Sequence, residues 1–203
     1  MLWGGHSGGL ELRKRASGAL ALHGRFPYNK RAVLSDGGRT GRPRKEVIAS
    51  RAFAYRVERP EEGIHFLVGH SYDRPLASRG AGTLDLTDTD DALSIVATIT
   101  PEMQEVSYVA DFLRGFTAGL IIGLSPGFRI PPPRTVPDAE EVTEEDPAEG
   151  NALIRTIFQA LLYEISVVTR PAYDETQLEA RDWKLTGDGL VMPKMRPAQR
   201  WRL

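Results

Sequence analysis

A serine between small residues is the first candidate for chemistry in this chain of 203 residues. Ser125 lies in the segment 123–127, which reads Gly-Leu-Ser-Pro-Gly and leaves room for a substrate carbonyl to approach. A serine hydroxyl attacks a carbonyl only when a base takes its proton and when donors stabilise the oxyanion. The pattern alone is weak, because it is equally typical of a strand that ends in a glycine turn. A nucleophile is therefore predicted only if a base and an orienting group accompany it.

The base must come from upstream, because all four histidines precede Ser125 in the chain. In an α/β-hydrolase the histidine follows the serine and a helix begins directly after it, and the proline-rich segment 128–133 cannot form that helix. That fold is therefore excluded on two counts. His70 is the best candidate for the base, since it ends an alternating apolar segment that begins at Ile64 and predicts a strand. His65 is predicted to lie on the opposite face of that strand and to be exposed.

A third group has to hold the imidazole and balance its charge. Glu164 lies in an otherwise apolar strand and shares a face with Ser166, and a carboxylate there is costly without a partner such as a histidine. Asp73, close to His70 in sequence, is the alternative. Pro126 has no N–H, so oxyanion donors have to come from Ser125, Gly127 or another loop, and Arg170 is a further candidate.

Most of the chain is predicted to form short strands. Thr83–Leu86 and Leu93–Thr98 predict two strands joined by an acidic turn, Leu120–Phe128 predicts the strand that contains Ser125, and 154–168 predicts one long strand. One helix is expected after Thr100, with Pro101 at its first position and Gly119 at its end. A second short helix is expected over 46–57. Many strands with one good helix favour a β-barrel or an α+β fold.

Composition narrows the function classes. The formal charge of −1 gives no general argument for nucleic acid or an anionic membrane as the main partner. The absence of cysteine excludes disulfides, thiolate metal sites and a cysteine nucleophile, and no His-Glu-x-x-His motif is present, so neither metal nor cofactor is expected. No apolar segment resembles a signal peptide or a membrane span, and we expect a soluble intracellular protein.

Three regions are predicted along the chain. Residues 1–18 are expected to be a flexible N-terminus, 19–180 a single catalytic domain, and 181–203 a flexible, basic C-terminal tail. Within the domain, the segment 131–151 begins with three prolines and is then rich in Asp and Glu. It is predicted to be a disordered acidic excursion between two strands.

Four stretches, taken in order, resemble the caudovirus prohead serine protease family, whose members mature the capsids of tailed phages. The stretches are 46–53, the strand 66–70 that ends in His70, the segment 123–128 around Ser125, and 162–173 around Glu164. The resemblance covers about residues 19–180. The chain departs from the family in having Pro126 where a branched apolar residue is common after the serine. It also has Gly69 where asparagine often precedes the histidine.

The resemblance implies a fold similar to that of the herpesvirus assemblins, an α+β fold with a mainly antiparallel closed β-barrel and a few surrounding helices. It implies a serine endopeptidase with His70 as base, Ser125 as nucleophile and Glu164 as third member. The implied partners are the major capsid protein with its scaffold segment and the protease itself, through self-cleavage and a homodimer. Cleavage would take place inside the prohead, in the host cytoplasm, with no membrane or specific nucleic acid as partner.

Two alternatives stay open at this point. A non-catalytic capsid-assembly protein could keep the same barrel and bind scaffold, and Pro126 is the feature that favours it. A nucleic-acid-binding module would rest only on the basic loop 36–45 and on the basic tail after Trp183.

Overall fold

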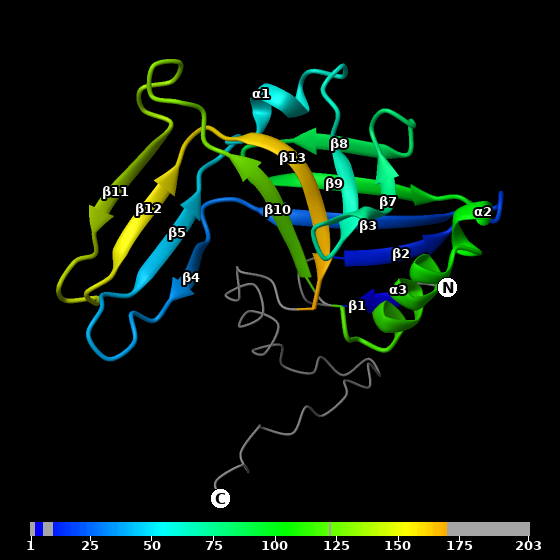
Figure 1. The fold of residues 1–203 in the computed structure, drawn as a ribbon, viewed down its shortest axis with the longest axis horizontal. Coiled ribbons are helices and arrows are strands. Elements are labelled where there is room, and N and C mark those ends of the chain that lie inside the picture. The colour runs from blue at the N-terminus through cyan, green and yellow to red at the C-terminus, as the bar shows by residue number, and fades with distance from the viewer. Residues whose placement is uncertain (1–2, 6–9, 122, 170–203) are drawn as a thin grey trace, which may run out of the picture.

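The computed structural model describes residues 3–5, 10–121 and 123–169, and all statements of structure below concern these residues. They form three β-sheets with two short helices and one longer helix (Figure 1). No helix in these ranges has the length and apolar character needed to cross a bilayer.

The largest sheet is a five-stranded antiparallel sheet that forms one side of the core. Its strands in spatial order are β1 (Trp3–Gly5), β2 (Leu10–Lys14), β3 (Leu20–Pro27), β9 (Ala92–Ile99) and β8 (Leu84–Asp88). Strands β8 and β9 confirm the two strands predicted over 83–98. The prediction of a flexible N-terminus over 1–18 is wrong for β2, because Leu10 and Leu12 are buried apolar side chains that hold this strand against β3.

A four-stranded mixed sheet crosses in front of the first one (Figure 1). Its strands in spatial order are β10 (Gly123–Arg129), β13 (Leu161–Val168), β6 (His65–Val68) and β7 (Ser71–Ser78). β13 is antiparallel to β10 and parallel to β6. The two sheets pack closely where β10 meets β3, because a Cβ atom on Gly24 would lie 2.9 Å from Leu124 Cδ1. Buried apolar side chains such as Leu22, Ile95 and Phe66 fill the core.

The third sheet extends to one side of the other two (Figure 1). Its strands in spatial order are β11 (Glu140–Glu144), β12 (Leu153–Ile157), β5 (Arg44–Ile48) and β4 (Arg31–Ser35). The prediction of a disordered acidic excursion is wrong for β11, whose strand pairs with β12. Arg155 of β12 binds Glu140 of β11 and also Glu46 of β5. The segment is therefore ordered by its backbone pairing with β12, and ion pairs to neighbouring strands accompany this pairing.

The helices are α1 (Ala54–Val57), α2 (Pro101–Gln104) and α3 (Ser107–Thr117). Thr100 caps α2 as predicted, since its hydroxyl accepts a hydrogen bond from the Met103 N–H at 3.3 Å. At the end of α3, Gly119 has a positive φ of 71° and the Leu120 N–H donates to the Gly115 carbonyl, which is a Schellman motif.

The prediction of a closed barrel is wrong. The protein is mostly β, and within the part of the chain that the structure describes the strands form three separate sheets of which none closes on itself. Two strand pairs, β12 with β5 and β13 with β6, are parallel, and the first of these belongs to the sheet that leaves the body of the molecule. The alternation of apolar and polar residues in a sequence identifies strands and their buried faces, but it does not determine which strands pair with each other. The strand pattern left a β-barrel and an α+β fold open, and the closed barrel is what the family resemblance implied.

Candidate active site

The β6–β7 hairpin places His70 in a tight turn. Val68 pairs with Ser71, which leaves Gly69 and His70 as the two central residues, with φ of 60° and 62°. Positive φ at both central positions is the signature of a type I′ turn. Glycine and asparagine both suit the first position, so Gly69 in place of asparagine keeps the backbone geometry. His70 therefore lies in the turn that follows β6, and not at the end of the strand as predicted.

His70 and Glu164 are in direct contact. The imidazole Nδ1 lies 2.7 Å from Glu164 Oε1, and the carboxylate is buried, whereas 47% of the histidine side chain is exposed. Because a carboxylate only accepts hydrogen bonds, Nδ1 carries the proton in the neutral imidazole. Nε2 then keeps its lone pair, and a half-exposed ring can present it to a substrate. Asp73, the alternative partner, is exposed in β7 and makes no hydrogen bond or ion pair with another described residue.

Ser166 connects these two residues. Its hydroxyl, fully buried, donates to Glu164 Oε2 at 2.6 Å and accepts a hydrogen bond from the backbone N–H of His70 at 2.9 Å. The two carboxylate oxygens of Glu164 thus have separate partners, one on the imidazole and one on the serine.

Ser125 lies opposite Ser166 in the β10–β13 ladder, and Gly127 lies opposite Glu164. Residues directly opposite each other in an antiparallel pair project from the same face of the sheet, with Cα atoms about 4.5–5.5 Å apart. Ser125, Ser166 and Glu164 therefore share one face, and Ser125 is partly exposed there. Among hydrogen bonds between described residues, none joins the Ser125 hydroxyl to the imidazole.

Gly127 leaves the space that Glu164 occupies. A Cβ atom added to Gly127 would lie 1.9 Å from Glu164 Oε1 and 2.6 Å from its Cδ. The second glycine of the segment 123–127 was predicted to leave room for substrate, and the structure gives it a different use. Only the cross-strand register reveals it, so the sequence alone offered no signal.

The ladder also determines where the backbone of Ser125 points. The Gly69 N–H donates to the Val167 carbonyl, so Val167 directs its backbone groups toward β6. The N–H and C=O groups of successive residues in a strand point to opposite sides, so those of Ser166 point toward β10. The N–H and C=O groups of Ser125 and Gly127 therefore point toward β13 and take part in the ladder. Pro126 then faces the free edge of β10, where its missing N–H interrupts no ladder bond.

The other predicted residues lie elsewhere or outside the described ranges. His65 is half-buried, pairs in register with Glu164, and makes an edge-to-face contact with Tyr72 at 5.6 Å between ring centroids. The predicted exposure of His65 is therefore wrong, and the register places His65 on the same face of the sheet as Glu164. Arg170 falls outside the described residues. Within the described ranges, no group of three or more His, Asp or Glu side chains is arranged to hold a metal ion.

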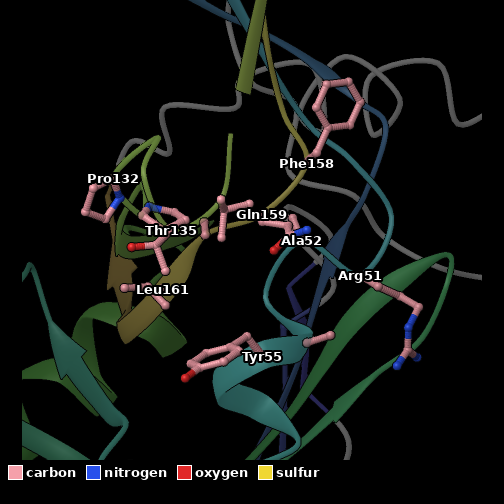
Figure 2. Close-up of a pocket in the computed structure, with 12 residues that line it drawn as sticks. Arg51, Ala52, Tyr55, Pro132, Thr135, Phe158, Gln159 and Leu161 are labelled. Atoms are coloured by element: carbon pink, nitrogen blue, oxygen red, sulfur yellow. The ribbon is translucent and has the colours of Figure 1, made fainter. Parts of the chain in front are cut away.

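A cavity of about 440 Å³ lies apart from these residues. Figure 2 shows Tyr55 of α1, Pro132 and Thr135 of the segment after β10, and Leu161 of β13 around it. Leu161 pairs with Arg129, at the opposite end of the β10–β13 ladder from Gly123 and Val168, and none of His70, Ser125 and Glu164 lines the cavity. It is therefore separate from the candidate site.

A comparison with protein families gives a match over most of the chain. The family described as caudovirus prohead serine protease matches residues 34–188, more than half of the chain. Comparisons with curated proteins and with solved structures give no match.

Proposed function

The chain belongs to the caudovirus prohead serine protease family, and from that premise we propose that it is an endopeptidase in which Ser125 is the nucleophile, His70 the general base and Glu164 the group that orients the base. The family establishes a serine peptidase, a hydrolase, with a role in the phage prohead. The observation that carries the assignment of residues is the 2.7 Å contact between His70 and Glu164 on the face that bears Ser125.

The proposed reaction proceeds through an acyl-enzyme. His70 Nε2 accepts the hydroxyl proton of Ser125 while Oγ forms a bond to the peptide carbonyl carbon, and the imidazolium is stabilised by the Glu164 carboxylate. Nε2 then gives its proton to the amine nitrogen as the C–N bond breaks. A water molecule, deprotonated by Nε2, attacks the acyl carbon, and the C–Oγ bond breaks as Ser125 regains a proton.

The direction of the β10 backbone bears on oxyanion stabilisation. The N–H groups of Ser125 and Gly127 are directed at β13, and Pro126 has none. Donors to the oxyanion therefore have to come from another segment of the chain or from rearrangement of β10 when substrate binds. Pro126 lies on the edge without disturbing the ladder, so it is compatible with an active enzyme and gives little support to a non-catalytic scaffold-binding protein.

We propose as substrates the scaffold segment of the major capsid protein and the protease chain itself, cleaved inside the prohead. The test is incubation of a capsid precursor with the wild type and with Ser125→Ala, followed by mass spectrometry of the products. Removing one oxygen should leave the fold intact and abolish cleavage of both substrates. Ser78→Ala is the matched control and should cleave normally, because Ser78 belongs to the same sheet and its hydroxyl, among described residues, accepts only from the Ala81 N–H. Undiminished cleavage by Ser125→Ala would refute the proposal. Binding of the precursor without cleavage by the wild type would instead favour a scaffold-binding protein.

A further inference from the structure

We infer that Ser166 is a positioning residue of the active site, which fixes both the base and its carboxylate through one buried hydroxyl. The inference rests on the proposed function. Ser166 has no exposed surface, and its hydroxyl uses its proton for Glu164 and a lone pair for the His70 backbone. A single side chain thus contacts the two groups whose relative position decides whether Nε2 points toward Ser125.

The contact with His70 secures a backbone amide that the turn itself leaves unpaired. In a two-residue hairpin turn, the flanking residues exchange the backbone hydrogen bonds, and the N–H of the second central residue has no partner in the turn. His70 occupies that second position, and the Ser166 hydroxyl accepts its N–H at 2.9 Å. The imidazole is half-exposed, so contacts of the ring hold His70 only on one side. The bond from the backbone N–H holds the residue at β13 independently of the ring.

The contact with Glu164 fixes the rotation of the carboxylate. Oε2 is held by Ser166 at 2.6 Å and Oε1 is held by the imidazole at 2.7 Å. Without the serine, the carboxylate is free to rotate about its last side-chain bond, and the direction in which Oε1 meets the imidazole is no longer fixed. The carboxylate of a serine, histidine and acid triad acts mainly by orienting the imidazole, so the rotation of the Glu164 carboxylate affects catalysis.

A merely structural role for Ser166 would have a different signature. If the hydroxyl only satisfied a buried carboxylate, its loss would lower stability and leave turnover of the folded enzyme unchanged. If it positions the base, its loss lowers kcat while KM is retained, because substrate binding does not involve it.

The experiment compares Ser166→Ala, Ser166→Thr and the control Ser78→Ala on a peptide that spans a cleavage site of the wild type. Loss of a hydrogen bond to a charged group predicts a fall in kcat of about 10- to 100-fold for Ser166→Ala, with KM nearly unchanged. Ser166→Thr keeps the hydroxyl and should recover most of this loss. The proton NMR resonance of His70 Nδ1–H should move or broaden in Ser166→Ala and stay in place in the control.

A wild-type kcat and an unmoved resonance in folded Ser166→Ala would overturn the inference. If Ser166→Ala does not fold, Ser166→Cys, which keeps a similar volume with a weak donor, takes its place with the same expected loss. The outcomes for the two serines are separable. Activity in Ser125→Ala would remove the proposed function, whereas inactive Ser125→Ala together with fully active Ser166→Ala would remove only the role of Ser166.

Discussion

A methyl group added at Gly127 on β10 should disable the candidate active site, because Gly127 lies opposite Glu164 on β13. In Gly127→Ala the new Cβ would lie 1.9 Å from Glu164 Oε1, and ordinary contact begins at 3.4 Å. Relief by the carboxylate alone requires a retreat of about 1.5 Å, and a hydrogen bond of 2.7 Å that lengthens by this amount is broken. Loss of the orienting carboxylate costs about 10⁴-fold in kcat in Ser-His-Asp enzymes, so we expect a fall of about 10³- to 10⁴-fold.

The same displacement has a cost in stability. Glu164 is buried, and each of its two hydrogen bonds contributes roughly 1.5–3 kcal/mol as a bond to a charged group. With partial relaxation we expect Gly127→Ala to lower the free energy of unfolding by about 2–4 kcal/mol, which leaves a typical domain folded. Urea unfolding measures this loss, and cleavage of the capsid precursor measures the activity.

A double-mutant cycle tests the cause. Glu164→Ala removes the three atoms that lie nearest to the new Cβ, so Gly127→Ala should cost little further stability in that background. Gly63→Ala is the matched control, because a Cβ atom there meets nothing within 4 Å and its φ is not positive. Equal destabilisation with and without Glu164, or near-wild-type cleavage by Gly127→Ala, would refute the reasoning.

Two further predictions concern the turn that carries His70 and a buried carboxyl group outside the site. Gly69 has a φ of 60° and open space around it, so Gly69→Asn should keep stability and cleavage near the wild type, whereas Gly69→Val should lose about 1–2 kcal/mol and most activity. Similar behaviour of both variants in urea unfolding and cleavage would contradict this. Burial raises the pKa of Asp88, whose Oδ1 accepts from the Tyr28 hydroxyl and whose buried Oδ2 has no partner among the described residues. Its ionisation therefore weakens the fold as pH rises through the raised pKa, and Asp88→Asn should raise Tm by a few degrees at about pH 8 but not at about pH 3. A gain of equal size at both pH values would contradict this explanation.

Local patterns predicted the strands best. The strands predicted over 83–86, 93–98 and 120–128 correspond to β8, β9 and β10, although β10 begins only at Gly123. Local patterns were less successful where pairing decided the structure. The helix predicted over 46–57 begins only at Ala54, since Glu46–Ile48 belong to β5 and pair with β12. The single long strand predicted over 154–168 is two strands in different sheets, separated at Phe158–Ala160.

The candidate site was predicted in part, and the reason lies in energetics. A carboxylate between apolar residues has to find a partner, and Glu164 has two. That argument needs no knowledge of the fold. The contribution of Gly127 and the second contact of Ser166 depend on strand register and on a turn, which no local pattern specifies.

Strand spacing favours His70 over His65 as the base proposed for Ser125. β13 lies between β10 and β6, so a side chain on β6 is two strand spacings, about 10 Å, from one on β10. His65 is in this position, in register with Glu164 and against Tyr72. His70 has left β6, and its turn bends back so that its backbone binds Ser166 on the central strand, directly opposite Ser125. The backbone of His70 is thereby held at β13, which is the direct neighbour of β10. In the proposed site, a left-handed turn and not a strand therefore carries the base toward a nucleophile that comes late in the chain.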